Sequence, residues 1–112
     1  MEVCKEMQIL RDWLDKNKIE WKDASEDFSS NILGKIDHEM WICRTHFKIK
    51  KHSISVINGF GTYGGYGIFS SDNQGLLETM GLWYGDDSVK GYLTADEVIN
   101  KVKGFINYLE GK

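Results

Sequence analysis

Residues 40 to 49, with the sequence MWICRTHFKI, alternate between two chemically different sets of side chains. The first set consists of Trp41, Cys43, Thr45, Phe47 and Ile49, and the second consists of Met40, Ile42, Arg44, His46 and Lys48. Successive side chains of a β-strand point to opposite faces of its sheet. The stretch therefore predicts a strand whose first set faces a core and whose partly basic second set faces away from it.

Shorter segments separated by turn residues predict the rest of the sheet. The expected strands are IEW (19–21), SISVIN (53–58), YGIFSS (66–71) and LLETMGLWY (76–84), with turns at KKH (50–52) and DNQG (72–75). The polar run KDASEDFSSN (22–31) is predicted to be a loop. Short strands joined by such connections favour an antiparallel meander.

Both ends of the chain show the apolar periodicity of a one-sided helix. The first helix should cover residues 3–16 and end near Asn17, with a stripe at Val3, Met7, Leu10 and Leu14. The second should begin at a capping box, TADE, and carry its stripe at Val98, Val102, Phe105 and Leu109. We predict one α+β domain over residues 1–112: an antiparallel sheet of about five strands, with the N-terminal and C-terminal helices packed on its apolar face.

The overall charge limits the partners. The net charge is -3, and Arg11 and Arg44 are the two arginines. Because nucleic-acid binding depends on many contacts from Lys and Arg to phosphates, we expect no nucleic-acid polymer as partner, whereas a small anionic ligand is compatible. The sequence has no apolar run near the roughly 20 residues of a membrane span and no signal-peptide core at its start, so we expect a cytoplasmic protein without membrane association. Its two cysteines should be reduced, with Cys43 buried.

The stretch NGFGTYGGYG (58–67) contains five glycines, and three of them satisfy the pattern G-x-G-x-x-G. In dinucleotide-binding folds that pattern opens a helix, but the residues that follow here, YGIFSSDNQG, have no helical periodicity. Two interpretations remain open. The glycines can supply positive φ angles in a hairpin connection, or they can let the backbone approach a ligand whose phosphate oxygens accept from its amides.

Aromatic and basic side chains near this stretch suggest what such a ligand would contain. The aromatics are Phe60, Tyr63 and Tyr66. They could stack on a purine base, or they could belong to the core or to a protein interface. The basic residues Arg44, His46 and Lys48 recur about every 6.6 Å along the expected strand, either as a solvated face or as a phosphate-binding row. Arg44 is the strongest candidate, because its planar guanidinium can bind a diphosphate through two hydrogen bonds.

Signals for catalysis and metal binding are weak. His38 and His46 would lie about 26 Å apart on one extended strand, too far to share a metal ion. Adjacent acids at Asp86 and Asp87 favour a turn. The sequence contains none of the common hydrolase, metalloprotease or phosphate-loop motifs. We therefore expect no catalytic residue, no metal site and no cofactor.

Three segments together resemble the phage anti-Thoeris proteins of the first described type: IDHEMWICRTHFKI, SISVINGFGTYGGYGIFSSDNQG and GLWYGDDSVKGYLTADEVI. The resemblance covers most of the chain and concerns the overall pattern, not a catalytic motif. It implies a phage or prophage protein of the bacterial cytosol that binds cyclic ADP-ribose isomers made by a TIR-domain enzyme. Such proteins sequester the signal without degrading it and are oligomeric, and some members also bind cyclic oligonucleotides at a separate site.

The resemblance and the residues lead to one leading hypothesis and two alternatives. We expect a homo-oligomeric sponge for a cyclic ADP-ribose isomer, which needs an aromatic platform, polar groups for hydroxyls and cations for the diphosphate. The candidate ligand-binding residues are Arg44, His46, Asn58, Phe60, Thr62, Tyr63 and Tyr66. The alternatives are a protein-binding inhibitor of a bacterial defence enzyme and, third, an enzyme that cleaves the signal.

Overall fold

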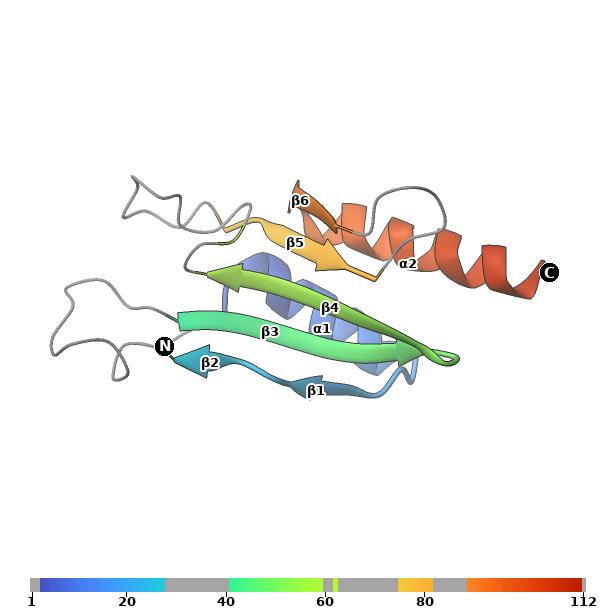
Figure 1. Cartoon of the computed structure of the whole chain (residues 1–112), viewed down its shortest axis with the longest axis horizontal. Coiled ribbons are helices and arrows are strands. Elements are labelled where there is room, and N and C mark those ends of the chain that lie inside the picture. The colour runs from blue at the N-terminus through green and yellow to red at the C-terminus, as the bar shows by residue number, and fades with distance from the viewer. Residues whose placement is uncertain (1–2, 28–40, 60–61, 63–74, 82–88, 112) are drawn as a thin grey trace, which may run out of the picture.

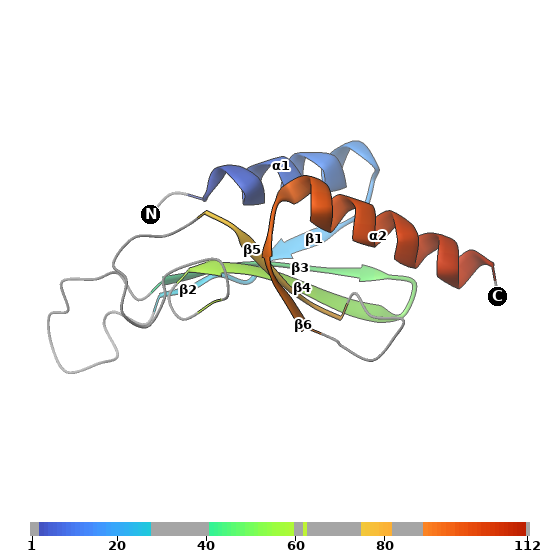
Figure 2. The same ribbon diagram turned by 90° about the horizontal axis from the view of Figure 1, so that it is seen from above.

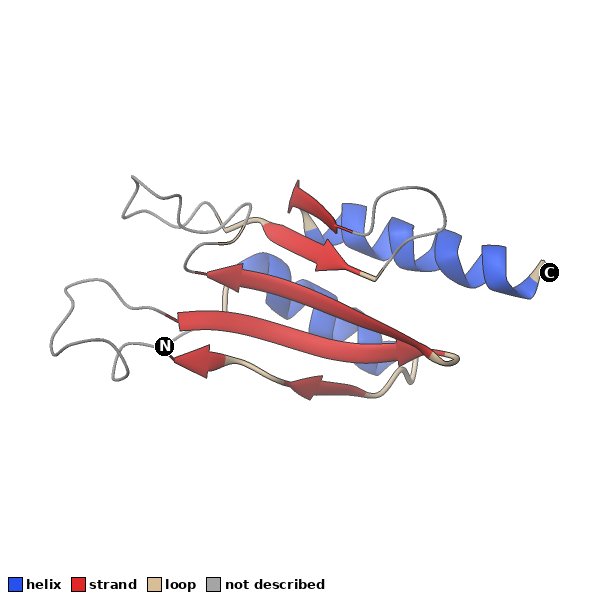
Figure 3. Cartoon of the chain, viewed as in Figure 1, coloured by secondary structure: helices blue, strands red, loops and turns tan. Residues whose placement is uncertain are grey.

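The computed structural model describes residues 3–27, 41–59, 62, 75–81 and 89–111. The described elements are, in chain order, α1 (Lys5–Lys16), β1 (Trp21–Asp23), β2 (Glu26–Asp27), β3 (Trp41–Ile49), β4 (His52–Gly59), β5 (Leu77–Met80), β6 (Val89–Leu93) and α2 (Ala95–Glu110). The strands form one layer and the helices a second layer behind it (Figure 3).

The strands form one antiparallel sheet in the order β1-β3-β4-β5-β6, and β2 also pairs with β3 (Figure 1). Because β1 and β2 follow each other along the same edge of β3, the described sheet has six strands but is five strands wide. The predicted α+β fold, a sheet of about five strands with a helix at each end of the chain, is confirmed.

The pairing of β3 with β4 sets the two faces of the sheet. The ladder runs from Ile42 opposite Gly59 to Ile49 opposite His52. Within it Phe47 faces Ile54, and both side chains are buried. The odd-numbered positions of β3 from Cys43 to Ile49 are all buried, as the alternation predicts; nothing is described for the Trp41 side chain. The even-numbered positions point to the opposite face, which we call the outer face.

Both helices cover the inner face of the sheet (Figure 2). The first ends at Lys16 with Asn17 as C-cap, as predicted. The second starts with the predicted capping box: the Oγ1 of Thr94 accepts a 3.3 Å hydrogen bond from the Glu97 backbone N–H, and the Glu97 carboxylate accepts a 3.0 Å bond from the Thr94 backbone N–H. The core between the layers includes Met7, Leu10 and Leu14 of α1, Ile54 and Val56 of β4, and Val98, Val102 and Phe105 of α2. Neither described helix is long and apolar enough to cross a membrane.

The strand boundaries depart from the sequence-based prediction at both edges of the sheet. The expected loop over 22–31 is wrong where β1 and β2 pair with β3, and the expected strand 19–21 shares only Trp21 with β1. Strand β1 has three residues, of which Trp21 is half-buried and the other two are exposed, so that its sequence carries almost no apolar alternation. The strand β6 was not predicted, and its lysine and glycine, which are both depleted in strands, explain why its pattern is weak. The expected strand 66–71 and the segment 72–74 of the expected DNQG turn lie outside the described residues.

Candidate functional site

The basic residues of β3 lie on the outer face of the sheet, as predicted. Arg44 and His46 are half-buried and Lys48 is exposed. The antiparallel register adds a fourth cation, because Lys22 of β1 pairs with His46 and therefore shares its face. Within the described parts of the chain, no hydrogen bond or ion pair involves any of these four side chains. We call these four residues the cationic row.

One carboxylate belongs to the same face. Arg44 pairs with Ile57, and Ile57 pairs with Glu78 of β5. The backbones of Arg44 and Glu78 are two strand spacings apart, which corresponds to about 10 Å between their Cα atoms. Glu78 is 8% exposed. At that separation it offsets part of the positive potential of the cationic row without forming an ion pair with Arg44.

The two polar candidates in and before the glycine stretch have structural partners instead. Asn58 pairs with Cys43, lies on the inner face and is 3% exposed, and its Nδ2 donates a 2.7 Å hydrogen bond to the carbonyl of Leu76. It therefore holds the segment before β5 against the end of β4. The structure does not bring Asn58 together with Arg44 and His46, which face the opposite side.

Thr62 closes a turn at the start of the glycine stretch. Its Oγ1 donates a 2.9 Å hydrogen bond to the carbonyl of Gly59 and accepts a 3.0 Å bond from the Gly59 N–H. The Thr62 backbone N–H also donates to the Gly59 carbonyl. Gly59 has φ 144°, so the interpretation of a turn-forming glycine holds at this position. The remaining candidates, Phe60, Tyr63 and Tyr66, lie outside the described residues, as do Gly61 and Gly64.

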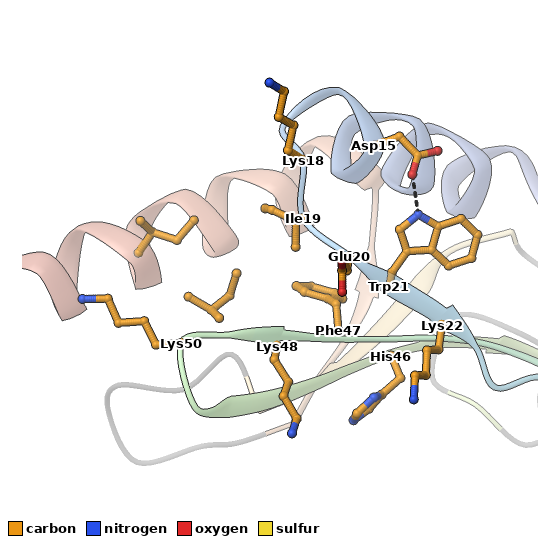
Figure 4. Close-up of a pocket in the computed structure, with 12 residues that line it drawn as sticks. Asp15, Lys18, Ile19, Glu20, Trp21, Lys22, His46, Phe47, Lys48 and Lys50 are labelled. Carbon is orange, nitrogen blue, oxygen red and sulfur yellow. Dashed lines mark hydrogen bonds between the residues drawn. The ribbon is translucent and has the colours of Figure 1, made fainter.

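A groove adjoins the cationic row at the edge of the sheet (Figure 4). It is present because β1 pairs only with Thr45 to Phe47, so that β3 continues past the end of its edge partner. The groove has a volume of about 1000 Å³. Its apolar lining comes from Ile19, Phe47, Ile49 and Ile106, and its basic lining from Lys18, Lys22, Lys48 and Lys50 together with His46. Lys22, His46 and Lys48 of the cationic row border the groove, and their side chains point to the side of the strands opposite Ile19 and Phe47 (Figure 4).

A buried arginine fixes the edge strand that carries Lys22. Arg11 of α1 is 5% exposed, and its Nη2 lies 3.4 Å from the Oδ1 of Asp23 and donates a 3.2 Å hydrogen bond to the carbonyl of Arg44. Its guanidinium carbon also lies 4.6 Å from the ring centroid of Trp21. The sequence analysis did not predict this role. The position of Arg11 could have indicated it: Arg11 follows Leu10 and precedes Leu14 by three residues, which places it beside the buried face of α1.

The same cluster influences two ionisable groups. Hydrogen bonds from Ser25, with the nearby Arg11 guanidinium, lower the pKa of Asp23, which keeps this carboxylate charged. Burial raises the pKa of the Cys43 thiol, which therefore stays protonated at neutral pH and is a poor nucleophile. No group of three or more His, Cys, Asp or Glu side chains that could hold a metal ion occurs in the described ranges. The chemistry that the outer face offers is the binding of anions.

Comparison of the chain with protein families, with curated proteins and with solved structures gives no match in any of the three.

Proposed function

We propose that this protein binds a small anionic nucleotide of the cyclic ADP-ribose class and sequesters it without cleaving it. The observation that carries the proposal is the cationic row: Arg44, His46 and Lys48 at alternate positions of one strand, with Lys22 beside His46, all without a protein partner among the described residues. A diphosphate that bridges neighbouring members of such a row would receive charge-assisted hydrogen bonds from both.

Each cation makes a different contribution. Arg44 is half-buried, and its planar guanidinium can donate two parallel hydrogen bonds to a phosphate. Lys48 and Lys22 are exposed point charges on flexible stems, which attract an anion and adapt to its position. The row therefore favours a ligand with two adjacent phosphates over one with a single charge.

The identity of the signal follows from the resemblance to anti-Thoeris proteins. On that basis the protein acts in the cytosol of a phage-infected bacterium, where it lowers the free concentration of a TIR-derived cyclic ADP-ribose isomer and prevents activation of the downstream effector. A homo-oligomer fits this role, as the resemblance implies, and among the described residues the sheet ends in short strands, β1 and β2 on one side and β6 on the other. Light scattering at tens of micromolar should give a mass above that of one chain.

The test is recovery of the ligand. The protein is mixed with a cyclic ADP-ribose isomer, separated from free nucleotide on a desalting column and heat-denatured, and the released nucleotide is identified by mass spectrometry. Intact ligand in a stoichiometric amount is the expected result. Altered ligand would instead support an enzyme, and the absence of any bound nucleotide at micromolar concentration would leave the protein-binding inhibitor as the better hypothesis.

A further inference from the structure

The groove beside β1 has chemical features that a nucleotide site does not require. Its floor is aliphatic: Ile19 and Ile106 are half-buried and line it from the segment after α1 and from α2. The lining contains two aromatic rings: Phe47 is 2% exposed and offers no open face on which a base could stack, and the half-buried Trp21 has the Arg11 guanidinium over its ring at 4.6 Å. An alkyl chain, which needs only apolar contact, suits this floor better than a purine does.

The floor also continues beyond the groove. A smaller adjoining pocket of about 400 Å³ between the two helices is lined by Trp13 and Lys103 and shares Ile19 and Ile106 with the groove. The two pockets therefore adjoin at Ile19 and Ile106, and Asn17 and Asn107 complete the lining of the smaller one.

The rim of the groove is basic. Lys18, Lys22, Lys48 and Lys50 all line it, and all four are exposed. In the described portion of the chain, these ammonium groups have no hydrogen-bond or ion-pair partner. Figure 4 shows that Lys22 and Lys48 extend to the side of the strands opposite Ile19 and Phe47 and that Lys18 extends away from the apolar centre, so that these ammonium groups lie outside the groove and the side-chain stems border it. Lysine side chains are flexible, so they can bind an anionic group without the fixed geometry that an arginine guanidinium imposes.

The carboxylates of the lining do not neutralise this rim. Asp15 accepts a 2.8 Å hydrogen bond from the Trp21 indole Nε1 and faces that ring (Figure 4). Glu20 is the other carboxylate in the lining, against four lysines. A second copy of this chain meeting the groove with its own groove would bring eight lysines together, which is unfavourable. The charge thus selects an anionic occupant and disfavours a symmetric contact between copies.

We infer that the groove binds an amphipathic anion: a single alkyl chain that lies on Ile19 and Ile106 and ends in a carboxylate or phosphate bound by the lysines that border the groove. A volume of about 1000 Å³ is at the upper end of the range of small-molecule sites, which is sufficient for such a ligand. This site adjoins the proposed nucleotide site and shares Lys22, His46 and Lys48 with it, so that the two ligands should compete in part.

The experiment is isothermal titration calorimetry with four probes below their micelle concentrations. Dodecanoate and dodecyl phosphate carry both the chain and the charge. Acetate carries the charge without the chain, and dodecyl maltoside carries the chain without the charge. The inference predicts binding of the first two at micromolar to submillimolar concentration and no measurable binding of the other two. Binding of dodecyl maltoside as tight as that of dodecanoate, or no binding of either anionic probe, would overturn it.

Two pairs of variants locate the binding. Ile106→Glu places a carboxylate in the floor, and Ile9→Glu makes the same change at an exposed position of α1 outside the groove. The first should weaken dodecanoate at least tenfold, and the second should leave it unchanged. The double variant Lys48→Glu, Lys50→Glu should have the effect of Ile106→Glu without disturbing the apolar floor, with Lys5→Glu as its control. Circular dichroism melting checks that each variant is folded, and wild-type affinity in both groove variants would contradict the site.

A further experiment distinguishes binding of free amphiphiles from binding to a lipid surface. Vesicles of phosphatidylglycerol are compared with dodecanoate in a flotation assay. The inference expects monomeric dodecanoate to bind and to reduce any flotation with vesicles. Flotation without binding of the monomeric probes would assign the lysine rim to a membrane surface and would overturn the inference. If Ile106→Glu no longer binds dodecanoate but still yields intact nucleotide in the recovery assay, the groove and the nucleotide site can be disrupted separately.

Discussion

The Nε of Arg11 donates a 2.7 Å hydrogen bond to the Oγ1 of Thr45, which joins the middle of α1 to the middle of β3. Thr45 is fully buried, and its hydroxyl in turn donates to the Sδ of Met7 at 3.1 Å. This bond anchors a polar cluster within an otherwise apolar layer. The cluster holds β1 at the edge of the sheet, and β1 supplies Lys22 to the cationic row and Trp21 to the wall of the groove.

Replacement of Arg11 by alanine should therefore destabilise the fold. The Thr45 hydroxyl and the Arg44 carbonyl would each lose a buried hydrogen-bond partner, and we expect a loss of about 2 to 4 kcal/mol in the free energy of unfolding. The measurement is urea denaturation followed by tryptophan fluorescence. Lys16→Ala, at an exposed position of the same helix, is the control and should change stability by less than about 0.5 kcal/mol. Equal effects of the two substitutions would contradict a structural role for Arg11.

The lowered pKa of Asp23 predicts a pH dependence of stability. Because Ser25 and Arg11 favour the ionised carboxylate in the folded state, this group stabilises the fold above the pKa of the unfolded chain, near 3.8. The contribution is lost as the pH falls through the lower pKa of the folded state. The stability difference between wild type and Asp23→Asn should accordingly be largest at neutral pH and shrink below about pH 4. A difference that stays constant from pH 7 to pH 3 would show that the charge of Asp23 contributes nothing.

Two glycines offer a matched test of backbone strain against steric space. Gly75 and Gly81 have φ angles of 74° and 96°, which side-chain-bearing residues rarely adopt. Among the described residues, a Cβ at Gly75 would meet no atom within 4 Å, whereas a Cβ at Gly81 would clash with the backbone carbonyl oxygen of Ser53. Gly75→Ala should lower stability by about 1 kcal/mol through strain alone, and Gly81→Ala by more, since the β4 backbone must also move. Thermal melting should rank the two variants in this order.

The sequence predicts the centre of this fold better than its edges, for a physical reason. The alternation through Cys43 and Phe47 and the helical stripe through Leu10 and Leu14 reflect burial on one side, which leaves a periodic pattern. Strand β1 contains Trp21, Lys22 and Asp23, and what holds it in place is the long-range contact with Arg11. A contact between residues so far apart in the chain leaves no local pattern.

The residues of the candidate site also differ in how well the sequence predicts their positions. The sequence places Arg44 and His46 on one face, because successive side chains of a strand point to opposite faces of the sheet. The burial of Asn58 could not be foreseen, because a polar residue at an inner position gives no sign of whether its partner is a ligand or, as here, the carbonyl of Leu76. The groove could not be foreseen either, since it depends on where β1 stops pairing with β3, which periodicity does not encode.

The most direct test of the proposed function is calorimetric titration of a cyclic ADP-ribose isomer into the wild-type protein and Arg44→Ala, with Lys5→Ala as control. The two parallel hydrogen bonds from the guanidinium to a diphosphate should be worth about 2 to 3 kcal/mol, so we expect Arg44→Ala to bind roughly 30- to 150-fold more weakly. Its melting temperature should stay within a few degrees of the wild type, because the Arg44 side chain forms no hydrogen bond or ion pair within the described residues. Lys5→Ala should bind as the wild type does. Wild-type affinity in a folded Arg44→Ala protein would contradict the assignment of the cationic row as the ligand site.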